Sequence, residues 1–178
     1  ERPPRLLEAE GRKGRVHQLR VDHRAIDCDL VVMSGSPQPN YKLLAQAGAR
    51  VSYDADRGVF VPRDLPAGVS AVGAAAGDVG SPAVPAPVLG TGGDKCFVCF
   101  CEDQTTKDLK YAIEEGFDSI ELSKRYTTVT MGPCQGKLCH LGSIRLYAKE
   151  NGADESEIGT TTARPPWAPV ELGLLAGR

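Results

Sequence analysis

Several features that mark common protein classes are scarce or absent in this sequence. The net charge is only −2 over 178 residues, so the bulk charge gives no reason to expect a nucleic-acid partner or an anionic membrane. No apolar run approaches the length of a membrane-spanning helix, and the opening stretch ERPPRLLEAEGRKGR has no apolar segment that would serve as a signal peptide. These absences predict a cytoplasmic protein with no nucleic-acid partner and no membrane partner.

Catalytic signatures and an ordinary N-terminus are also lacking. The sequence shows no Ser/His/Asp arrangement and no paired carboxylates, so we assign no catalytic residue. It has no initiator methionine, and no compact unit closes at its C-terminal end. We therefore expect an internal part of a larger subunit, inactive by itself.

Changes in composition along the chain predict an α+β fold class in four parts. The expected parts are a β-rich part at residues 1–80, a Pro/Gly linker at 81–95, a small all-α part at 96–152 and an extended connector at 153–178. Within the first part, β-branched and apolar runs predict strands at 15–21, 26–34 and 68–78, a hairpin of 51–54 with 58–62, and a short helix at 41–48.

The third part predicts three helices, at residues 105–116, 118–126 and 137–152. Thr105 and Asp108 have the spacing of a capping box at the start of the first helix. Asp118 is the expected cap of the second helix, and the third carries apolar residues at helical spacing.

The cysteines are the most informative residues. Five of the six fall between Cys96 and Cys139, and a chain without a secretion signal gives no reason to expect a disulfide framework. Four of them follow the pattern Cys99-x-Cys101 and Cys134-x4-Cys139. Thiolates are soft ligands, and four suit a 2Fe–2S cluster or a structural zinc ion. The one-residue gap puts two sulfurs side by side on an extended loop, which favours two ligands on one iron over zinc.

Several alternatives stay open at these positions. The four cysteines could hold zinc, form a disulfide or be a vestigial site, and Cys96, spaced Cys-x2-Cys from Cys99, could replace one ligand. Cys28 is expected to be a small core residue of the strand at 26–34. His140 follows the last cysteine and could be a Rieske-type ligand, but we expect a partly exposed helix residue because four cysteines already fill the site.

Residues around the cysteines support a charged cluster. Gly132 and Gly136 let the backbone come close, so that its amides can donate to the sulfurs. Lys124, Arg125 and Lys137 are near in sequence and could offset the negative charge of four thiolates.

The motif CFCEDQTTKDLKYAIEEGF…SKRYTT…MGPCQGKLC resembles the 2Fe–2S domain of the bacterioferritin-associated ferredoxin type, in the variant found in amine-oxidising flavoenzymes. The resemblance spans roughly residues 97–150. It implies a small helix-turn-helix fold with the cluster at one end, bound by the four paired cysteines.

Residues 1–80 resemble the tail of a two-dinucleotide-binding flavoprotein reductase domain, through CDLVVMSGSPQPN and AVGAAAGDVG. The resemblance implies Gly77 and Asp78 as candidate cofactor contacts, with a turn-capping role for Asp78 as the alternative. The Gly-x-Gly-x-x-Gly fingerprint is absent and a proline-rich linker follows, so we expect no dinucleotide binding by this chain alone.

The stretch EIGTTTARPPWAPVELGLLAGR, placed after the cysteine motif, resembles the alpha subunits of heterotetrameric sarcosine oxidase. This resemblance implies a component of a flavin-dependent oxidoreductase that demethylates sarcosine to glycine. It further implies FAD, FMN, NAD and tetrahydrofolate in the intact complex, with beta, gamma and delta subunits as partners and a small amine as substrate.

The chain would then supply a one-electron relay or a structural brace. A dye-linked opine or proline dehydrogenase is one alternative, and a non-redox zinc or scaffold module is another. In the tail, Arg164-Pro165-Pro166-Trp167 is expected to be a rigid linker that packs its tryptophan against a neighbouring domain.

Overall fold

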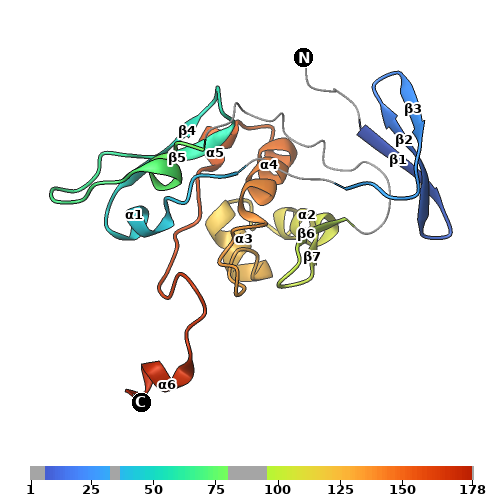
Figure 1. Ribbon diagram of the computed structural model, residues 1–178. Coiled ribbons are helices and arrows are strands. Elements are labelled where there is room, and N and C mark those ends of the chain that lie inside the picture. Colours follow the sequence, from blue (N-terminus) through green and yellow to red (C-terminus); the bar gives the residue numbers. More distant parts are fainter. Residues whose placement is uncertain (1–6, 33–36, 80–95, 178) are drawn as a thin grey trace.

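The computed structural model describes residues 7–32, 37–79 and 96–177. Within them the chain is a mixed α/β structure of small antiparallel sheets and short helices, as predicted (Figure 1). The expected linker at 81–95 lies outside the described residues. No helix in the described ranges is both long enough and apolar enough to cross a lipid bilayer.

The first three strands form an antiparallel sheet beside the helices. They are β1 (Leu7–Arg12), β2 (Arg15–Val21) and β3 (Arg24–Asp27), in the order β1-β2-β3. Tight turns join them, with positive φ at Lys13, Gly14 and Asp22. All four β3 residues are exposed, so this sheet has little apolar cover on its third strand.

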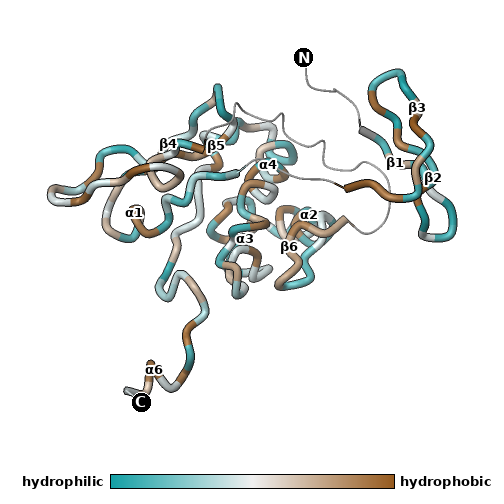
Figure 2. The backbone as a smooth tube through the Cα atoms, in the orientation of Figure 1, coloured by the Kyte–Doolittle hydropathy of each residue, from teal (hydrophilic) through white to brown (hydrophobic). Residues whose placement is uncertain are grey.

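The strand predicted at 26–34 is wrong, because pairing stops at Asp27. Beyond it, Leu30 and Val32 are exposed by 71% and 83% in the apolar stretch that is brown in Figure 2. Cys28 is half-buried and its N–H donates to the His17 carbonyl at 3.1 Å, so the expectation of a core cysteine is also wrong. β3 is the edge strand of its sheet among the described residues, so the apolar residues that follow it have no further strand to support an extended pairing.

The middle of the chain confirms the predicted helix and hairpin. They appear as α1 (Lys42–Gln46), β4 (Arg50–Asp54) and β5 (Val59–Arg63). The strand predicted at 68–78 is wrong, because that stretch contains the 3-10 turn η1 (Gly73–Ala76). Its Gly-Ala-Ala-Ala sequence has no β-branched side chain to favour an extended strand. Gly77, with φ +94°, lets the Asp78 N–H reach back to the Gly73 carbonyl at 3.0 Å.

The cysteine-bearing part contains helices and a small hairpin. Its elements are β6 (Phe97–Cys99), β7 (Gln104–Thr105), α2 (Thr106–Glu114), α3 (Ile120–Thr127), α4 (His140–Asn151) and α5 (Glu155–Ile158). The three predicted helices are present, but the expected all-α character is wrong because β6 pairs with β7.

The helix starts are encoded locally, with one correction. Thr105 and Asp108 form the predicted capping box, with the Thr105 N–H 2.8 Å from Asp108 Oδ2. The cap of α3 is Ser119 instead of Asp118: its backbone is extended and its Oγ accepts from the Leu122 N–H at 3.3 Å.

The main core combines side chains from before and after the predicted linker. Side chains from α1 and β5 pack with side chains from α2, α3 and α4; the buried members are Tyr41, Phe60, Leu109, Ile120, Ile144, Leu146 and Tyr147. Tyr147 also donates its hydroxyl to the Phe117 carbonyl at 3.1 Å. The hairpin β4–β5 and the helices therefore share one apolar interior.

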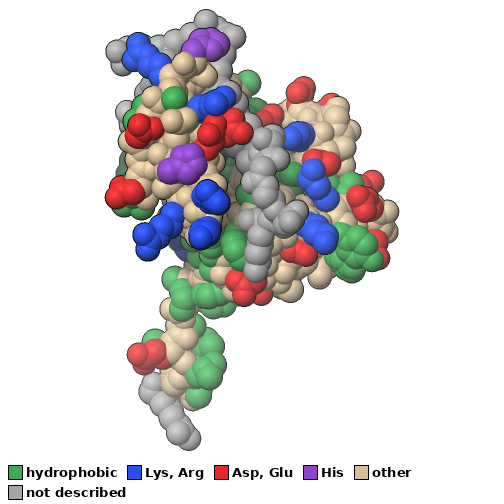
Figure 3. Space-filling view, turned by 90° about the vertical axis from the view of Figure 1, so that its right-hand side faces the viewer, with side chains coloured by type: hydrophobic (Ala, Val, Ile, Leu, Met, Phe, Trp, Pro, Cys, Tyr) green, Lys and Arg blue, Asp and Glu red, His purple; other side chains and the backbone are tan. Residues whose placement is uncertain are grey.

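The C-terminal residues extend away from the hairpin and the helices. After α5 the chain is mostly extended, as predicted, and ends in the short helix α6 (Leu172–Leu175). Figure 3 shows this segment projecting from the rest, with hydrophobic side chains on its surface.

Candidate metal centre

Two loops bring the four predicted ligands together. Cys99 ends β6 and Cys101 lies in the following turn, while Cys134 and Cys139 lie in the loop before α4. The thiols of Cys99 and Cys139 are within hydrogen-bonding range of each other, and so are those of Cys101 and Cys134. Cys99 and Cys139 are buried against Val129, whereas Cys101 is exposed. The sulfurs thus form two pairs, each with one member from each loop.

Backbone amides converge on one of these sulfurs. The N–H groups of Leu138, Gly136 and Lys137 face the sulfur of Cys134. Burial raises the pKa of the Cys134 thiol, but these donors and the neighbouring Cys101 outweigh it and hold the pKa below its usual value. The loop therefore makes the Cys134 thiol more acidic than an ordinary cysteine.

The pKa values of the Cys139 and Cys101 thiols are raised. Burial, followed by Cys99, raises the pKa of Cys139 to about 12, although the Thr130 N–H acts in the opposite direction. At Cys101 the Cys134 N–H lowers the pKa, but the thiols of Cys134 and Cys99 leave it above its usual value. Burial and neighbouring sulfurs thus oppose the charged form at Cys139 and Cys101.

Glycine allows a close approach at two points. A Cβ on Gly132 would lie 2.5 Å from the Cys101 Cβ of the other loop, and one on Gly136 would lie 3.0 Å from the Thr130 Cβ within its own loop. Both distances leave no room for a side chain without displacing a neighbour.

The pairing of the thiols differs from the sequence expectation. In the described part of the chain, no group of three or more His, Cys, Asp or Glu is arranged so that it could hold a metal ion. Each thiol pair takes one cysteine from each loop, whereas the one-residue gap predicted that Cys99 and Cys101 share one iron. A 2Fe–2S cluster at these four cysteines stays a prediction.

Cys96 remains an alternative ligand by prediction. It is half-buried just before β6, and its carbonyl accepts from the Thr106 N–H at 2.8 Å.

His140 is buried, so the expectation of a partly exposed residue is wrong. Its Nε2 lies 3.1 Å from Lys42 Nζ and 3.4 Å from the Thr161 N–H nitrogen. Both neighbours donate, so Nε2 accepts and the neutral ring carries its proton on Nδ1. Burial, then the charges of Lys42 and Lys124, lowers the pKa of His140 to about 3. Sequence reasoning missed this contact because nothing in the local pattern links α1 to α4.

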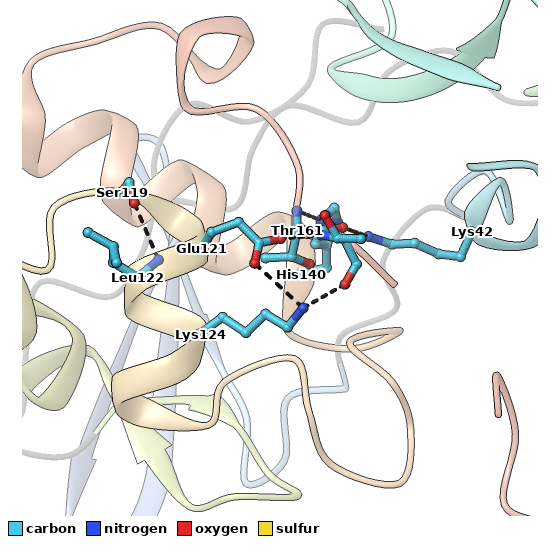
Figure 4. Close-up of polar contacts among 8 residues, drawn as sticks. Lys42, Ser119, Glu121, Leu122, Lys124, His140 and Thr161 are labelled. Atoms are coloured by element: carbon cyan, nitrogen blue, oxygen red, sulfur yellow. Dashed lines mark hydrogen bonds and ion pairs between the residues drawn. The ribbon is translucent and has the colours of Figure 1, made fainter. Parts of the chain in front are cut away.

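Two lysines reach the same extended stretch from different helices (Figure 4). Lys42 Nζ donates to the Thr161 carbonyl at 3.0 Å. Lys124 Nζ donates to the Thr162 carbonyl at 2.6 Å and lies 3.7 Å from Glu121 Oε2. Lys124, which the sequence suggested as a counter-charge for the thiolates, therefore has its nearest acceptors elsewhere.

Lys137 joins the tail to the cysteine loop. Its Nζ lies 3.9 Å from the centre of the Trp167 ring and donates to the carbonyls of Trp167 and Cys134 at 3.1 and 3.3 Å. Trp167 was expected to pack against a neighbouring domain, and in the structure it packs within this chain.

Gly77 contacts β5 and the turn that precedes it. A Cβ on Gly77 would lie 2.9 Å from Val61 Cγ1, and its carbonyl accepts from Arg57 Nη1 at 2.8 Å. Asp78 is exposed after the turn. Their role as cofactor contacts stays a prediction.

Comparison with known proteins shows what the cysteine-bearing part is similar to. Residues 93–178 match the family model described as the sarcosine oxidase A3 domain, and we refer to these residues as the A3 domain on the basis of this similarity. The sarcosine oxidase alpha chain of Rhizobium meliloti (strain 1021) is 46% identical over 95 residues, which are 52% of this chain and 10% of that protein. That of Corynebacterium sp. (strain P-1) is 41% identical over 83 residues, 46% of this chain and 9% of that protein.

The predicted relationship of this chain to sarcosine oxidase alpha subunits is thus confirmed, although the chain spans about a tenth of their length. A subunit of opine oxidase from Rhizobium meliloti (strain 1021) is 32% identical over 92 residues, 52% of this chain and 20% of that protein.

A solved structure shares the fold well beyond the A3 domain. L-proline dehydrogenase from P. horikoshii superposes with a TM-score of 0.72 at 21% identity, over 94% of this chain and 43% of that chain. The likeness includes the part that precedes residue 93, so the shared interior of hairpin and helices has a counterpart in a known oxidoreductase.

Proposed function

We propose that the A3 domain holds a 2Fe–2S cluster through Cys99, Cys101, Cys134 and Cys139. The observation that carries this proposal is the convergence of two loops into two thiol pairs. Backbone amides around Cys134 stabilise the thiolate form that a metal requires. A bound cluster of this kind supplies one-electron transfer.

The test is metal and sulfide analysis of the anaerobically purified protein, together with its visible spectrum. We expect iron and acid-labile sulfide in equal amounts and charge-transfer bands in the visible region. Cys134→Ser should remove most of both, whereas the matched variant Cys28→Ser should leave them unchanged. Cys96→Ser tests the swapped ligand. A colourless protein with one zinc per chain would overturn the cluster assignment.

We further propose that the chain works in a flavin-dependent oxidase that demethylates sarcosine to glycine. The support is the similarity to sarcosine oxidase alpha subunits. In this proposal the intact cytoplasmic complex contains beta, gamma and delta subunits and uses FAD, FMN, NAD and tetrahydrofolate. The A3 domain relays single electrons or braces the subunits, and Gly77 and Asp78 are candidate dinucleotide contacts.

The complex purified with its partner subunits separates relay from brace. If the domain relays electrons, Cys134→Ser should slow flavin reoxidation while all subunits still copurify. If the domain is a brace, fewer subunits should copurify with the same variant. The complexes that stay intact should still reoxidise their flavin at the normal rate.

Opine or proline oxidation is the second candidate function. The similarity to an opine oxidase favours the first of these substrates, and the shared fold with proline dehydrogenase is compatible with the second. Steady-state assays of the complex with sarcosine, an opine and L-proline decide between them, because the true substrate should show the highest kcat/KM.

A further inference from the structure

The two cysteine-bearing loops are held against each other by contacts that involve no thiol. The hydroxyl of Thr128, in the loop between α3 and α4, lies 3.1 Å from Glu102 Oε2, in the turn after β6. Gly132 of the first loop packs so closely on that turn that a Cβ there would lie 2.5 Å from the Cys101 Cβ. These contacts keep the loops together independently of any group bound to the sulfurs.

The loop between α3 and α4 is also fixed by hydrogen bonds of its own. The Gln135 N–H donates to the Gly132 carbonyl at 2.7 Å, and the Gln135 side-chain amide donates to the Met131 carbonyl at 3.1 Å. Hydrogen-bonded turns restrict the backbone of the residues they contain. Cys134, which lies between these turn residues, therefore keeps its place opposite Cys101 without a metal.

The two thiol pairs differ in how far solvent can reach them. In the inner pair, Cys99 and Cys139 are each exposed by only 1% and pack against Val129. In the outer pair, Cys101 is exposed and Cys134 is half-buried, and their thiols are within hydrogen-bonding range of each other. A dissolved oxidant therefore reaches the outer pair and not the inner one.

We infer that Cys101 and Cys134 form a reversible disulfide when the site holds no metal, and that this bond prevents the cluster from assembling. The oxidant is hydrogen peroxide. The geometry that supports the inference is the contact of an exposed thiol with a thiol of the facing loop, held in place by the backbone of both loops.

The reaction has two steps. The Cys101 sulfur attacks one oxygen of hydrogen peroxide, the O–O bond breaks, and Cys101 becomes a sulfenic acid as the first water leaves. The Cys134 sulfur then displaces the sulfenic oxygen, which leaves as the second water, and the S–S bond forms. The two thiols thus give up two electrons and two protons, which convert one hydrogen peroxide into two waters.

The disulfide would remove one ligand of each loop from metal binding. Cys99 and Cys139 alone leave a binuclear cluster without half of its thiolates. This consequence rests on the proposed cluster, whereas formation of the disulfide does not. Cluster assembly would then depend on reducing conditions, because a disulfide exposed to solvent is open to attack by other thiols.

Peptide mapping of the full chain without reductant tests the inference. The metal-free chain is reduced, freed of the reductant and treated with one equivalent of hydrogen peroxide. Cleavage after aromatic residues and lysine puts the four cysteines on separate peptides, since Phe100 and Lys137 lie between the members of each sequence pair. We expect the linked peptides of the outer pair to exceed all other cysteine links together, and the chain to lose two of its six free thiols.

Matched variants show whether the link is specific. Cys101→Ser and Cys134→Ser should each prevent it, whereas Cys28→Ser, the same change at a half-buried cysteine outside both loops, should form it like the parent. Circular dichroism of each variant checks the fold. Oxidation in urea should give mixed links, and the same selectivity in urea would overturn the inference, because the fold would then not be its source.

Reconstitution with ferrous iron and sulfide tests the consequence for the cluster. The oxidised chain should take up little iron, and the same sample should take it up fully after reduction with a phosphine. A reduced chain that binds no iron would overturn the cluster proposal, and with it the blocking role, while the mapped disulfide would still stand.

Three further outcomes would overturn the inference itself. They are the absence of thiol loss with peroxide, a predominant link between cysteines of the same loop, and iron uptake by the oxidised chain equal to that of the reduced chain.

Discussion

The β1–β3 sheet is stabilised differently from the body, by which we mean the hairpin β4–β5 and the helices that share the main core. In the sheet, strand pairing is accompanied by exposed contacts such as the Arg20–Glu10 ion pair at 2.9 Å, and every residue of β3 is exposed. In the body, Leu109, Ile144 and Tyr147 have no exposed surface. Surface ion pairs contribute little to stability, whereas buried apolar side chains contribute most of it. Mutations in the two regions should therefore differ sharply.

The largest expected effect is in the body. Ile144→Ala should lower the free energy of unfolding by about 2–5 kcal/mol, because it removes buried atoms and leaves a cavity. The matched change Ile26→Ala removes the same atoms from a side chain in β3 that is 48% exposed, and should cost less than about 1 kcal/mol. Urea denaturation followed by circular dichroism measures both, and equal shifts would contradict the comparison.

A glycine substitution tests whether the turn after η1 is packed as tightly as the helices. Gly77→Ala should cost about 2–4 kcal/mol, since it combines a left-handed backbone with a methyl group against Val61. Gly68→Ala, with φ +81° and open space around its Cβ, adds the backbone strain alone. That control should lose about 1–2 kcal/mol in thermal unfolding. A loss at Gly77 no larger than at Gly68 would show that this turn is loosely held.

Helix caps provide a smaller effect within the body. Ser119→Ala should destabilise α3 by about 1 kcal/mol, because the Leu122 N–H loses its acceptor. Asp118→Ala, at the neighbouring position favoured by sequence, should change stability by only a few tenths. Thermal melts of the two variants separate them, and a larger effect at Asp118 would mean that the helix begins one residue earlier.

Acid should weaken the capping box by a still smaller amount. Hydrogen bonds from the hydroxyl and then the N–H of Thr105 lower the pKa of Asp108. The carboxylate therefore contributes fully above the unfolded-state value of about 3.9 and loses this contribution as pH falls through the lower folded-state value. Asp108→Asn should be less stable than the parent at pH 7, with the difference shrinking below about pH 4. Asp56→Asn, in an exposed loop, is the control, and a difference that stays constant with pH would rule out this linkage.

Short sequence patterns predicted most of the helices and the hairpin β4–β5, but not how these elements pack against one another. Thr105 with Asp108 is a short-range pattern, and the structure uses it as expected. The stretch GVSAVGAAAGD looked like a strand because it is apolar, yet small residues without β-branching turn instead. Asp118 and Ser119 are both good caps, and only the backbone path decides between them.

The candidate site shows the same division between local and distant information. Cysteine spacing identified the four residues whose thiols the two loops bring close together, and Gly132 allows that approach. The contact of His140 with Lys42 depends on how α1 packs against α4. No pattern within either segment encodes that packing, so sequence alone placed His140 at the surface.

The interior shared by the hairpin and the helices has a consequence for biosynthesis. A ribosome releases Tyr41 and Phe60 well before Ile144 and Tyr147 exist, so β4 and β5 can pair while their inner face still lacks its cover. Contacts between residues so distant along the chain form late and slowly, because a long loop must close first. Until α4 emerges, the nascent hairpin presents an apolar surface that chaperones can bind.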